Sequence, residues 1–523
     1  MRLSTLVAGF QVTPSDADPE ISGVTEDSRR VRPGMLFVAV PGTLLDGHAY
    51  IADALSHGAV AVIAERTGAI PLGIPVVRVP SSRDALAVVA ARYYGTANSK
   101  LSLIGFTGTF GKTSTSDILR QLLNAAGHRT GVIGSLGARY DTFEHPGHGL
   151  TTPAPVELHK ALRDLEGAGA TTVILEVTSH ALMLGRVDGL RFAGGLLAAV
   201  MPGEHTDFHR SYEDYVEAKR LFLDYLNPGA LLAYDADNLA ARQLIAHGSA
   251  RSITAEATSA AIGIERHVHQ RHRRRTRPRD DAPAAAFRPI GFSIDGRDAD
   301  LCLYDVTLDG RGAAFSIGGR AVGARSGIRI QSPLLGRGHL RNVALALTYV
   351  LGTGLPISAA EPVVSRLAPL RRRMERYDVG ARTILDDTAA HPDSLRATFE
   401  VAALVPHQKL AVVYALRGRR GADINRQNAM ALADLSSLYG VEPLIITSSS
   451  DAVSQADAAQ PGEIDAARQA LVSRGRRFVW HDELRPALTD AIDRTRAGDL
   501  ILLVGAQGMN DAKELLQEMR TTN

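Results

Sequence analysis

Residues 101–116 read LSLIGFTGTFGKTSTS, and this stretch decides the fold of the largest part of the chain. A short apolar run leads into a glycine-rich turn, then a lysine, a run of hydroxyl residues and an apolar pattern at helical spacing. A strand, loop and helix in this order point backbone N–H groups and the positive end of a helix dipole at an anion. We therefore predict a phosphate-binding loop, with contacts from Gly108, Thr109, Gly111, Lys112, Thr113 and Ser114.

Two side chains of this loop carry the expected chemistry. Lys112 supplies a point charge for the β and γ phosphates of a nucleotide, and Thr113 offers a hydroxyl to Mg²⁺. The standard P-loop pattern has glycine where this chain has Phe106, so the match is to the shorter pattern TGTxGKT[ST]. The alternative, a Gly/Thr-rich turn with a chance lysine, is disfavoured because strand and helix flank the loop correctly.

The length and composition of the chain limit the classes of protein to which it can belong. A length of 523 residues corresponds to about three domains. The chain is 45% hydrophobic with a formal charge of +2, so we expect full-sized cores and no nucleic-acid partner. The single cysteine, Cys302, excludes an intramolecular disulfide framework. No apolar stretch reaches the length of a membrane span. We expect a cytoplasmic monomer that does not bind membranes.

The pattern of elements predicts an α/β fold of three domains. Residues 1–99 read as a small α/β domain, residues 100–333 as a central P-loop ATPase domain with a parallel sheet, and residues 334–523 as a doubly wound, Rossmann-like domain. Within the central part, the spacing predicts a helix over 212–226 and a β-hairpin layer over 291–319.

Three polar residues of the central part have positions that favour function. Glu176 ends a strand pattern, and the carboxyl end of a parallel strand near a P-loop is where a second Mg²⁺ ligand belongs. A surface glutamate is the alternative. His205 lies just past the end of another strand pattern. Lys219 has apolar neighbours on its helix, which indicates that one side of this helix is buried.

Two arginine-containing stretches leave alternatives open. Ser28, Arg29 and Arg30 stand beside a turn, where the guanidinium groups suit a phosphate or a uracil edge, although a solvated basic turn is equally consistent. Residues 262–286 hold seven arginines and three histidines, which predicts a disordered surface insertion. No aromatic residue interleaves that run, so it offers bases nothing to stack on.

Taken together, these motifs resemble the Mur ligase family over nearly the whole chain. The marks are DSRRVRPG, PGTLLDGH, TGTFGKTS, TTP, EVTSHALMLGRVDGLRF, HTDFH, YVEAKRLF, RRRMERYD and DDTAAHPDSL. Within the family, the chain is most similar to the members that add the third residue of the peptidoglycan stem peptide.

The resemblance implies an ATP-dependent amide ligase of peptidoglycan precursor synthesis. The carboxylate of UDP-N-acetylmuramoyl-L-alanyl-D-glutamate would attack ATP to give an acyl phosphate, and the amine of an amino acid would displace phosphate. The implied catalytic residues are Lys112, Glu176, His205 and Lys219, and the implied Mg²⁺ ligands are Thr113, Glu176, His205 and Lys219, the last of them carbamylated.

The resemblance also implies the binding residues. Contacts to the UDP-muramoyl-dipeptide would come from Ser28, Arg29, Arg30, Thr151, Thr152, Ser179 and Arg186. The last domain would bind the amino acid and close on ATP, with contacts from His339, Asn342, Arg373 and Asp387.

The chain departs from the family pattern near the nucleotide and near the amino acid. Around the nucleotide the departures are Phe110 for Asn, Ala199-Val200 for Thr-Asn, Glu204 for Asp, His339 for Asn, Thr388 for Tyr and Ala390 for His. Members that add diaminopimelate carry Asp-Asn-Pro-Arg where this chain has SSSDAVSQ, and Gly-Lys-Gly-His-Glu where it has AQGMN. The amino acid therefore stays open, with lysine and ornithine among the candidates.

Two alternatives to this activity follow from the departures. One is a Mur-type ligase of another pathway, and the paired arginines of the first domain speak against it because they suit a UDP-linked substrate. The other is a catalytically degenerate paralogue that binds a nucleotide-peptide. Phe110, Val200 and the altered DDTAAHPD stretch favour the degenerate paralogue. The retained metal-ligand and phosphate-binding set opposes it: Lys112, Thr113, Glu176, His205 and Lys219.

Overall fold

The computed structural model describes residues 1–12, 17–42, 45–66, 73–147, 149–202, 208–250, 287–323, 326–419, 421–455 and 457–521. These residues form two compact units. The first unit comprises Met1–Cys302, Gly319–Val322 and Leu345–Ala360, and the second comprises Leu303–Gly318, Gly323–Ala344 and Glu361–Asn523. The described residues contain three sheets, each combined with helices, which confirms the predicted α/β class. The boundaries after residues 99 and 333 stay predictions.

The N-terminal sheet has the order β1-β5-β4-β3-β2, and only the edge strand β1 runs antiparallel. Its strands are β1 Gln11–Val12, β2 Gly23–Thr25, β3 Met35–Val38, β4 Ala61–Ala64 and β5 Val76–Arg78, with helices α1 Leu3–Leu6, α2 Ile51–Ser56 and α3 Ser82–Tyr93. Successive strand residues face opposite sides of a sheet. Leu36 and Val38 accordingly join the core under α1 and α3, whereas Phe37 joins the core under α2. Cover on both faces explains why β3 is apolar throughout.

The second sheet begins in the first unit with the order β13-β12-β11-β6-β10-β7-β8-β9. Its strands are β6 Ser102–Thr107, β7 Thr130–Gly134, β8 Gly137–Tyr140, β9 Phe143–His145, β10 Thr172–Glu176, β11 Phe192–Leu197, β12 Leu226–Asp235 and β13 Arg288–Ser293. The strands from β13 to β7 are parallel. The antiparallel hairpin β8–β9, which was not predicted from the sequence, extends the sheet beyond β7.

Five helices of the first unit connect these strands: α4 Lys112–Ala125, α5 Pro155–Gly167, α6 Ser179–Met183, α7 Tyr212–Arg220 and α8 Leu239–Ala250. The helix predicted over 212–226 is shorter than expected, because α7 tightens into the 3₁₀ turn η4, Leu221–Tyr225, before β12 begins at Leu226. Tightening of the last turn is common at helix ends, where the final carbonyls lack intrahelical partners.

Strand β14, Leu301–Asp309, leads from the first unit into the second, and β15 Gly312–Gly318 and β16 Ile328–Ser332 follow it. Within the range 291–319 predicted as a hairpin layer, β13 and β14 pair in parallel, so these two strands do not form a hairpin and that part of the prediction was wrong. Strand β15 neighbours β14 in the sheet and pairs antiparallel with β16, which lies beyond the predicted range. Helices α10 Gly336–Gly352 and α11 Ile357–Val364 come next in the chain.

The third sheet lies entirely in the second unit and has the order β17-β18-β22-β19-β20-β21. Its strands are β17 Glu375–Val379, β18 Arg382–Asp387, β19 Leu410–Ala415, β20 Leu444–Thr447, β21 Val479–His481 and β22 Leu500–Gly505. All pairs except β17–β18 are parallel. This arrangement confirms the predicted doubly wound sheet.

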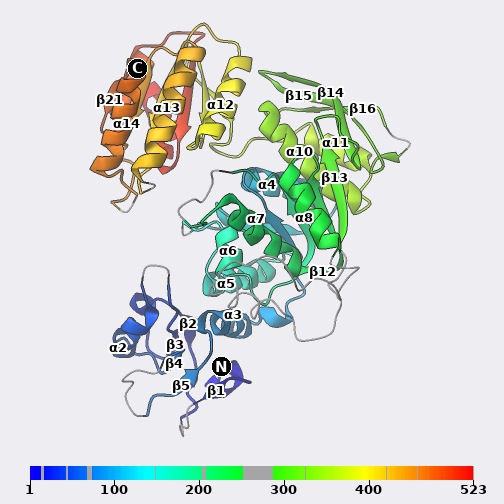
Figure 1. The fold of residues 1–523 in the computed structure, drawn as a ribbon, viewed down its shortest axis with the longest axis vertical. Coiled ribbons are helices and arrows are strands. Elements are labelled where there is room, and N and C mark those ends of the chain that lie inside the picture. Colours follow the sequence, from blue (N-terminus) through cyan, green and yellow to red (C-terminus); the bar gives the residue numbers. More distant parts are fainter. Residues whose placement is uncertain are drawn as a thin grey trace. The chain divides into compact units, whose positions relative to one another are not determined.

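Helices cover both faces of the third sheet. Figure 1 shows α12 Pro392–Leu404, α13 Ala422–Leu438 and α14 Pro461–Ser473 side by side on one face. The other face packs against α15 Leu484–Asp493 and α16 Ala512–Thr521. Along β19, Val412 faces the first set of helices and Val413 faces the second, as the period of a strand requires.

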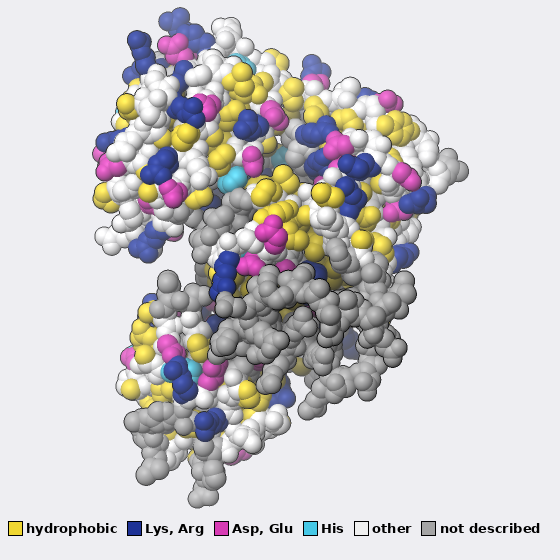
Figure 2. All heavy atoms as spheres, in the orientation of Figure 1, with side chains coloured by type: hydrophobic (Ala, Val, Ile, Leu, Met, Phe, Trp, Pro, Cys, Tyr) yellow, Lys and Arg dark blue, Asp and Glu magenta, His cyan; other side chains and the backbone are white. Residues whose placement is uncertain are grey.

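The described surface carries charges of both signs. On the face drawn in Figure 2, Lys and Arg side chains are interspersed with Asp and Glu. Among the described residues, no helix is long and apolar enough to cross a membrane. Cellular location and oligomeric state stay predictions.

Candidate active site

The loop between β6 and α4 has the backbone that a phosphate cradle requires. Gly108 and Gly111 both have positive φ, +151° and +79°, and Gly111 precedes the first residue of α4. A Cβ on Gly108 would come within 2.6 Å of the Ala198 side chain, so the loop packs closely against the segment after β11. Lys112 Nζ donates to the carbonyl oxygens of Gly108 at 2.9 Å and Thr109 at 3.1 Å. The lysine therefore lies over its own loop, at the N-terminus of a helix.

Lys219 reaches the same loop from α7. Its side chain is 2% exposed, and Nζ donates to the Gly108 carbonyl at 2.9 Å. The Tyr215 ring lies under the ammonium, with Nζ 4.7 Å from the ring centroid. A buried ammonium needs such partners, because burial otherwise penalises its charge. The predicted buried side of this helix is confirmed.

Thr113 and Glu176 are adjacent. The Thr113 hydroxyl donates to Glu176 Oε2 at 3.1 Å, and the Ser135 hydroxyl lies 3.4 Å from the same oxygen. Glu176 is 1% exposed at the carboxyl end of β10, next to β6 in the sheet, so it is not the surface glutamate of the alternative reading. A Cβ on Gly134 would come within 2.0 Å of Glu176 Oε1, so only glycine leaves room for this carboxylate.

The hydroxyl and carboxylate oxygens of Thr113 and Glu176 are the hard donors that Mg²⁺ prefers. They lie at the helix N-terminus beside the loop, so the described residues fit a magnesium ion accompanying a nucleotide. Among the described residues, no group of three or more His, Cys, Asp or Glu side chains suits a metal. The predicted ligand His205 lies outside the described residues, as do Glu204 and the Arg/His-rich insertion 262–286.

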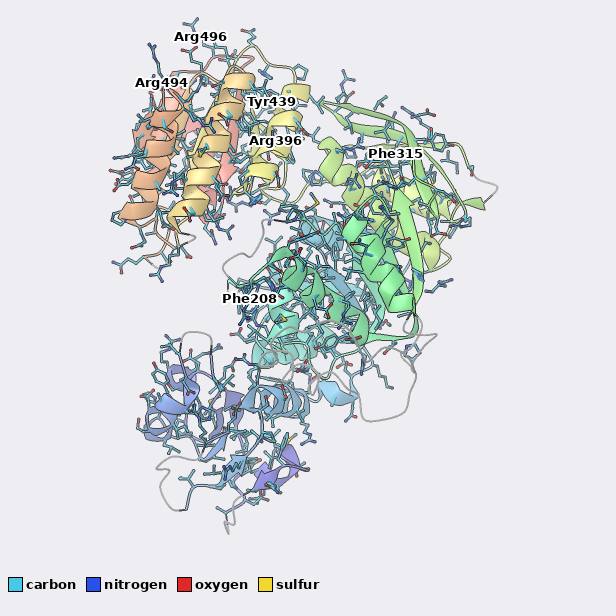
Figure 3. The ribbon with its side chains drawn as sticks, in the orientation of Figure 1. Phe208, Phe315, Arg396, Tyr439, Arg494 and Arg496 are labelled. Atoms are coloured by element: carbon cyan, nitrogen blue, oxygen red, sulfur yellow. The ribbon has the colours of Figure 1, made fainter. Side chains whose placement is uncertain are left out.

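An aromatic and polar cluster that was not predicted from the sequence lies beside the loop. The Tyr215 hydroxyl lies 3.0 Å from Thr109 Oγ1, which also accepts the Met201 N–H at 2.9 Å. Its ring contacts His209, whose Nε2 lies 2.9 Å from the hydroxyl of Ser179. Phe208, labelled in Figure 3, stacks on His180 with ring centroids 4.0 Å apart. Tyr215 belongs to the motif YVEAKRLF and His209 to the motif HTDFH, but the groups that they contact depend on tertiary packing.

The four central residues predicted to contact the dipeptide surround the end of β10 or follow it. Thr152 is fully buried, donates to the Glu176 carbonyl at 2.9 Å and accepts the Thr178 N–H at 3.0 Å. The Arg186 guanidinium donates to the Thr152 carbonyl at 2.9 Å. Burial lowers the pKa of Arg186, and the charge of Arg83 adds to this effect. Thr151 Oγ1 lies 2.9 Å from Ser135 Oγ, which links it to Glu176.

Ser28, Arg29 and Arg30 form the 3₁₀ turn η1 of the first unit. The Arg29 guanidinium pairs with Asp27, with Nε and Nη2 at 2.9 and 2.8 Å from the carboxylate oxygens. Arg30 pairs with Glu157 near the start of α5 at 2.5 Å. Ser28 is buried. Both arginines therefore have carboxylate partners, and only Arg30 approaches the central segment.

The predicted nucleotide contacts of the second unit lie near one another, apart from Asn342, for which no side-chain contact is described. Asp387 accepts the Met374 N–H at 3.2 Å and the Thr398 hydroxyl at 2.7 Å. The Arg373 guanidinium donates to the Thr388 hydroxyl. Burial lowers the pKa of His339. The Asp387 carboxylate opposes this decrease, and the positive charge of Arg373 adds to it. Asn342 lies one helical turn after His339 on α10.

The first unit thus combines a phosphate-binding loop, two lysines and a buried carboxylate at the carboxyl edge of a parallel sheet. This is the site of an enzyme that uses a nucleoside triphosphate. Comparison with family descriptions then gives the class: residues 20–94 match the Mur ligase family, catalytic domain, residues 106–279 the Mur ligase middle domain, and residues 372–507 the Mur ligase, glutamate ligase domain. The chain belongs to the Mur ligase family.

Individual proteins agree with this assignment. A UDP-N-acetylmuramoyl-L-alanyl-D-glutamate--2,6-diaminopimelate ligase of Chlorobaculum tepidum is 32% identical over 507 residues, covering 96% of this chain and 89% of the relative. The enzyme of the same name from Bacillus licheniformis is 29% identical over 516 residues, covering 97% and 94%.

Solved structures share the fold. A structure of a UDP-N-acetylmuramoyl-L-alanyl-D-glutamate--2,6-diaminopimelate ligase superposes with a TM-score of 0.63 at 22% identity, covering 99% of both chains. The MurF ligase of Thermotoga maritima in complex with ADP superposes with a TM-score of 0.61 at 20% identity, covering 96% of this chain and 98% of that one.

These findings confirm the predicted family and fold. The chain is an ATP-dependent ligase that forms an amide bond in peptidoglycan precursor synthesis. The individual residue roles stay predictions.

Proposed function

We propose that this chain joins an amino acid to UDP-N-acetylmuramoyl-L-alanyl-D-glutamate, through an acyl phosphate formed with ATP. The observation that carries the proposal is the convergence of Lys112 and Lys219 on the Gly108 carbonyl, beside the buried pair Thr113–Glu176. A carboxylate attacking ATP brings two anions together, so the site must supply positive charge. Lys112 and the helix N-terminus at this loop, together with Mg²⁺ beside Thr113 and Glu176, would meet that demand.

Lys112 is the residue that we propose to bind the β and γ phosphates of ATP. In this structure it donates to the carbonyls of its own loop. When ATP binds, we propose that the ammonium exchanges these carbonyls for the β and γ phosphate oxygens. Gly108, Thr109, Gly111 and Ser114 line the loop, and the backbone N–H groups at the start of α4 complete the cradle. The substrate carboxylate would form a bond to the γ phosphorus as the bond from that atom to the β–γ bridging oxygen breaks, giving the acyl phosphate and ADP.

Thr113, Glu176, His205 and Lys219 would hold Mg²⁺ in this proposal. The ion supplies charge neutralisation for the phosphates when bound. Lys219 would join the oxygen donors after its amine reacts with CO₂, which forms an N–C bond, releases a proton and leaves an anionic carbamate. Its near-complete burial and its position on the loop support this assignment, because a neutral amine is favoured where charge is poorly solvated.

The nucleotide-peptide would be held by the residues around β10 and by the η1 turn. Arg186 is half-buried with its guanidinium on the Thr152 carbonyl, and the hydroxyl of Ser179 is aligned by His209. We propose that Arg186, Ser179, Thr151 and Thr152 contact the muramoyl-peptide, while Ser28, Arg29 and Arg30 contact the UDP group. Binding by Arg29 and Arg30 requires them to share or exchange their present partners, Asp27 and Glu157.

We further propose that residues 1–99 serve the UDP group, residues 100–333 serve ATP and residues 334–523 serve the amino acid. His339, Asn342, Arg373 and Asp387 would add contacts to ATP. The relatives named above act on 2,6-diaminopimelate, so this amino acid is the first candidate. Lysine and ornithine are the next, because SSSDAVSQ after β20 has no arginine to grip a second carboxylate.

The test is a phosphate-release assay. The chain is incubated with ATP, Mg²⁺, UDP-N-acetylmuramoyl-L-alanyl-D-glutamate and, in turn, diaminopimelate, lysine, ornithine and the other amino acids. Phosphate release with one amine, and a product heavier by that residue, supports the proposal. Binding of the nucleotide-peptide without release in any mixture overturns it in favour of a non-catalytic paralogue. Release only with a nucleotide-peptide of a different kind indicates a ligase of another pathway.

A further inference from the structure

Arg372 is a buried charged residue whose side chain lies beside the carboxyl end of β18. Its side chain is 4% exposed, and its φ is +56°, which places a bulky residue in the left-handed region. Met374, two residues on, has a φ of +52°. Non-glycine residues in this region cost free energy and persist where surrounding contacts enforce them, often at functional sites. Arg373, a proposed ATP contact, lies between these two residues.

The hydrogen bonds of the Arg372 guanidinium hold this left-handed backbone conformation in place. Nε donates to Asp386 Oδ1 at 3.0 Å. Nη1 donates to the Ala506 carbonyl at 2.6 Å and to Asn510 Oδ1 at 2.8 Å, and Nη2 donates to the Gly505 carbonyl at 2.5 Å. One planar fork therefore joins the end of β18 to the turn that follows β22, two strands that are neighbours in the sheet.

The backbone of Arg372 fixes the other side of the same region. Its carbonyl accepts the Thr388 N–H at 3.2 Å, and its N–H donates to Glu375 at 3.0 Å. The Arg373 guanidinium in turn donates to Thr388, and the Met374 N–H donates to Asp387. The direction of Arg373 and the rotamer of Asp387 thus depend on how Arg372 is anchored.

A contribution to stability alone does not account for this arrangement. A buried ion pair such as Arg372–Asp386 gains little over an apolar pair of the same shape, because both charges lose their hydration. Burial raises the pKa of Asp386 to about 6, although Arg372 opposes this, so the carboxylate itself is held in an unfavourable setting. Such a network is better suited to fixing geometry than to adding free energy.

We infer that Arg372 is a positioning residue that aims Arg373 and Asp387 at the nucleotide, by fastening the end of β18 to the 505–510 turn. The inference rests on the proposed ATP contacts of Arg373 and Asp387. Its test is ATP affinity, measured by calorimetry with the full chain and Mg²⁺, which needs no turnover.

The informative variant is Arg372→Gly, because glycine adopts a φ of +56° without strain, so the variant removes the side chain with its guanidinium and leaves the backbone conformation accessible. The matched control is Arg382→Ala. Arg382 also fastens β18 through carbonyls, those of Ile492 and Thr495, but at the opposite end of the strand. Arg372→Lys keeps the charge and removes the fork, and it serves as the second variant if the glycine variant does not fold.

We expect Arg372→Gly to raise the Kd for ATP by about tenfold or more, since small misplacements of contact groups are costly. Added guanidinium at concentrations well below those that unfold proteins should recover much of the lost affinity. Arg382→Ala should lower Tm and leave the Kd within about twofold of the unmodified chain, which is the scatter expected of a distant site. Arg372→Lys should also weaken ATP binding.

The inference would be overturned if Arg372→Gly bound ATP with the same Kd as the unmodified chain. If the glycine variant does not fold, the same comparison is made with Arg372→Lys. An equal loss in Arg382→Ala would also overturn the inference, because it would show that any loosening of β18 has the same effect. Failure of the proposed function would look different: ATP would bind to the unmodified chain, no amino acid would release phosphate, and the comparison of Kd values would still decide the role of Arg372.

Discussion

Lys112 and Lys219 donate to the same oxygen, the carbonyl of Gly108, each at 2.9 Å. One lysine follows the phosphate-binding loop at the start of α4, and the other belongs to α7, which comes five strands later in the chain. Two ammonium groups on one carbonyl repel each other unless an anion comes between them or one loses its charge. A bound triphosphate provides the first solution, and reaction of Lys219 with CO₂ provides the second.

Lys219→Ala should therefore abolish ligation while the fold survives. We expect kcat in phosphate release to fall by at least about a hundredfold, the scale of losing a preorganised electrostatic group. Circular dichroism should match that of the unmodified chain. Lys160→Ala is the control, since Lys160 makes an exposed helix ion pair with Asp164. Full activity of Lys219→Ala would remove this lysine from the mechanism.

Tyr215→Phe tests whether the phenol positions the loop. The substitution keeps the ring under Lys219 and removes the hydroxyl that lies 3.0 Å from Thr109 Oγ1. Losing one neutral hydrogen bond corresponds to a decrease in kcat/KM for ATP of about threefold to tenfold. Tyr225→Phe removes a phenol bonded to Asp188 elsewhere in the same unit and should leave kcat/KM unchanged. The same loss in both variants would mean that the effect is general loosening.

Gly134→Ala should displace Glu176. The new methyl group would lie 2.0 Å from Glu176 Oε1, too close for any carbon–oxygen contact, so the carboxylate must move away from Thr113. We expect kcat to fall by about a hundredfold, because a displacement of about 1 Å in a catalytic group has effects of this size. The control is Gly167→Ala at the end of α5, where no atom lies within 4 Å of the added Cβ. An active Gly134→Ala enzyme would show that Glu176 is dispensable.

Phe110→Asn tests whether the phenylalanine, where the family has asparagine, lowers ATP turnover. Phe110 is 38% exposed, so asparagine fits without repacking a core. An amide there can hydrogen-bond within the loop, and we expect ATP turnover to rise by about twofold to threefold, the value of a weak hydrogen bond. Turnover equal to that of the unmodified chain would mean that the loop functions fully with Phe110.

His159 should make the stability of the first unit depend on pH. The side chain is fully buried on α5 with Nδ1 2.6 Å from Thr96 Oγ1, and burial lowers its pKa from 6.5 to about 4. The unfolded chain takes up a proton near pH 6.5 that the folded chain resists until near pH 4. Stability is therefore complete above pH 6.5 and decreases as the pH falls towards 4, by up to about 3 kcal/mol.

Urea unfolding at several pH values measures this loss. In His159→Gln the decrease between pH 6.5 and 4 should be smaller by about the contribution of one proton. His57→Gln, at an exposed position after α2, is the control. An unchanged pH dependence in His159→Gln would exclude His159 as the responsible group.

The phosphate loop, the strand-end position of Glu176 and the doubly wound C-terminal sheet could all be predicted from the sequence. Each depends on local patterns: apolar runs with a period of two or 3.6 residues, and glycines where the backbone needs positive φ. The hairpin β8–β9 was missed because its strands are short and partly exposed, so they lack the apolar run that marks a buried strand. The helix after Ser211 was predicted too long, because α and 3₁₀ turns share similar sequence patterns.

The contacts of individual side chains could not be predicted from the sequence. Nothing in the order of residues places the Tyr215 hydroxyl on Thr109, or His209 on Ser179, since these pairs meet only when α6 and α7 pack beside the loop. Arg372 and Arg373 are identical in type and adjacent, yet one is buried in a network and the other is partly exposed. The left-handed backbone of Arg372, with a φ of +56°, is likewise not evident from two identical neighbouring residues.

The sequence by itself therefore determined the kind of chemistry: a loop that binds phosphate, a lysine and a carboxylate at strand ends, and a family of ligases in which these recur. Residue type and spacing suffice for this, because the hydrogen-bonding capacity of a loop and the end of a strand are local properties. Only the tertiary structure decided that Lys219 shares the carbonyl of Gly108 with Lys112, since burial and distance between remote segments are set by packing of the whole unit.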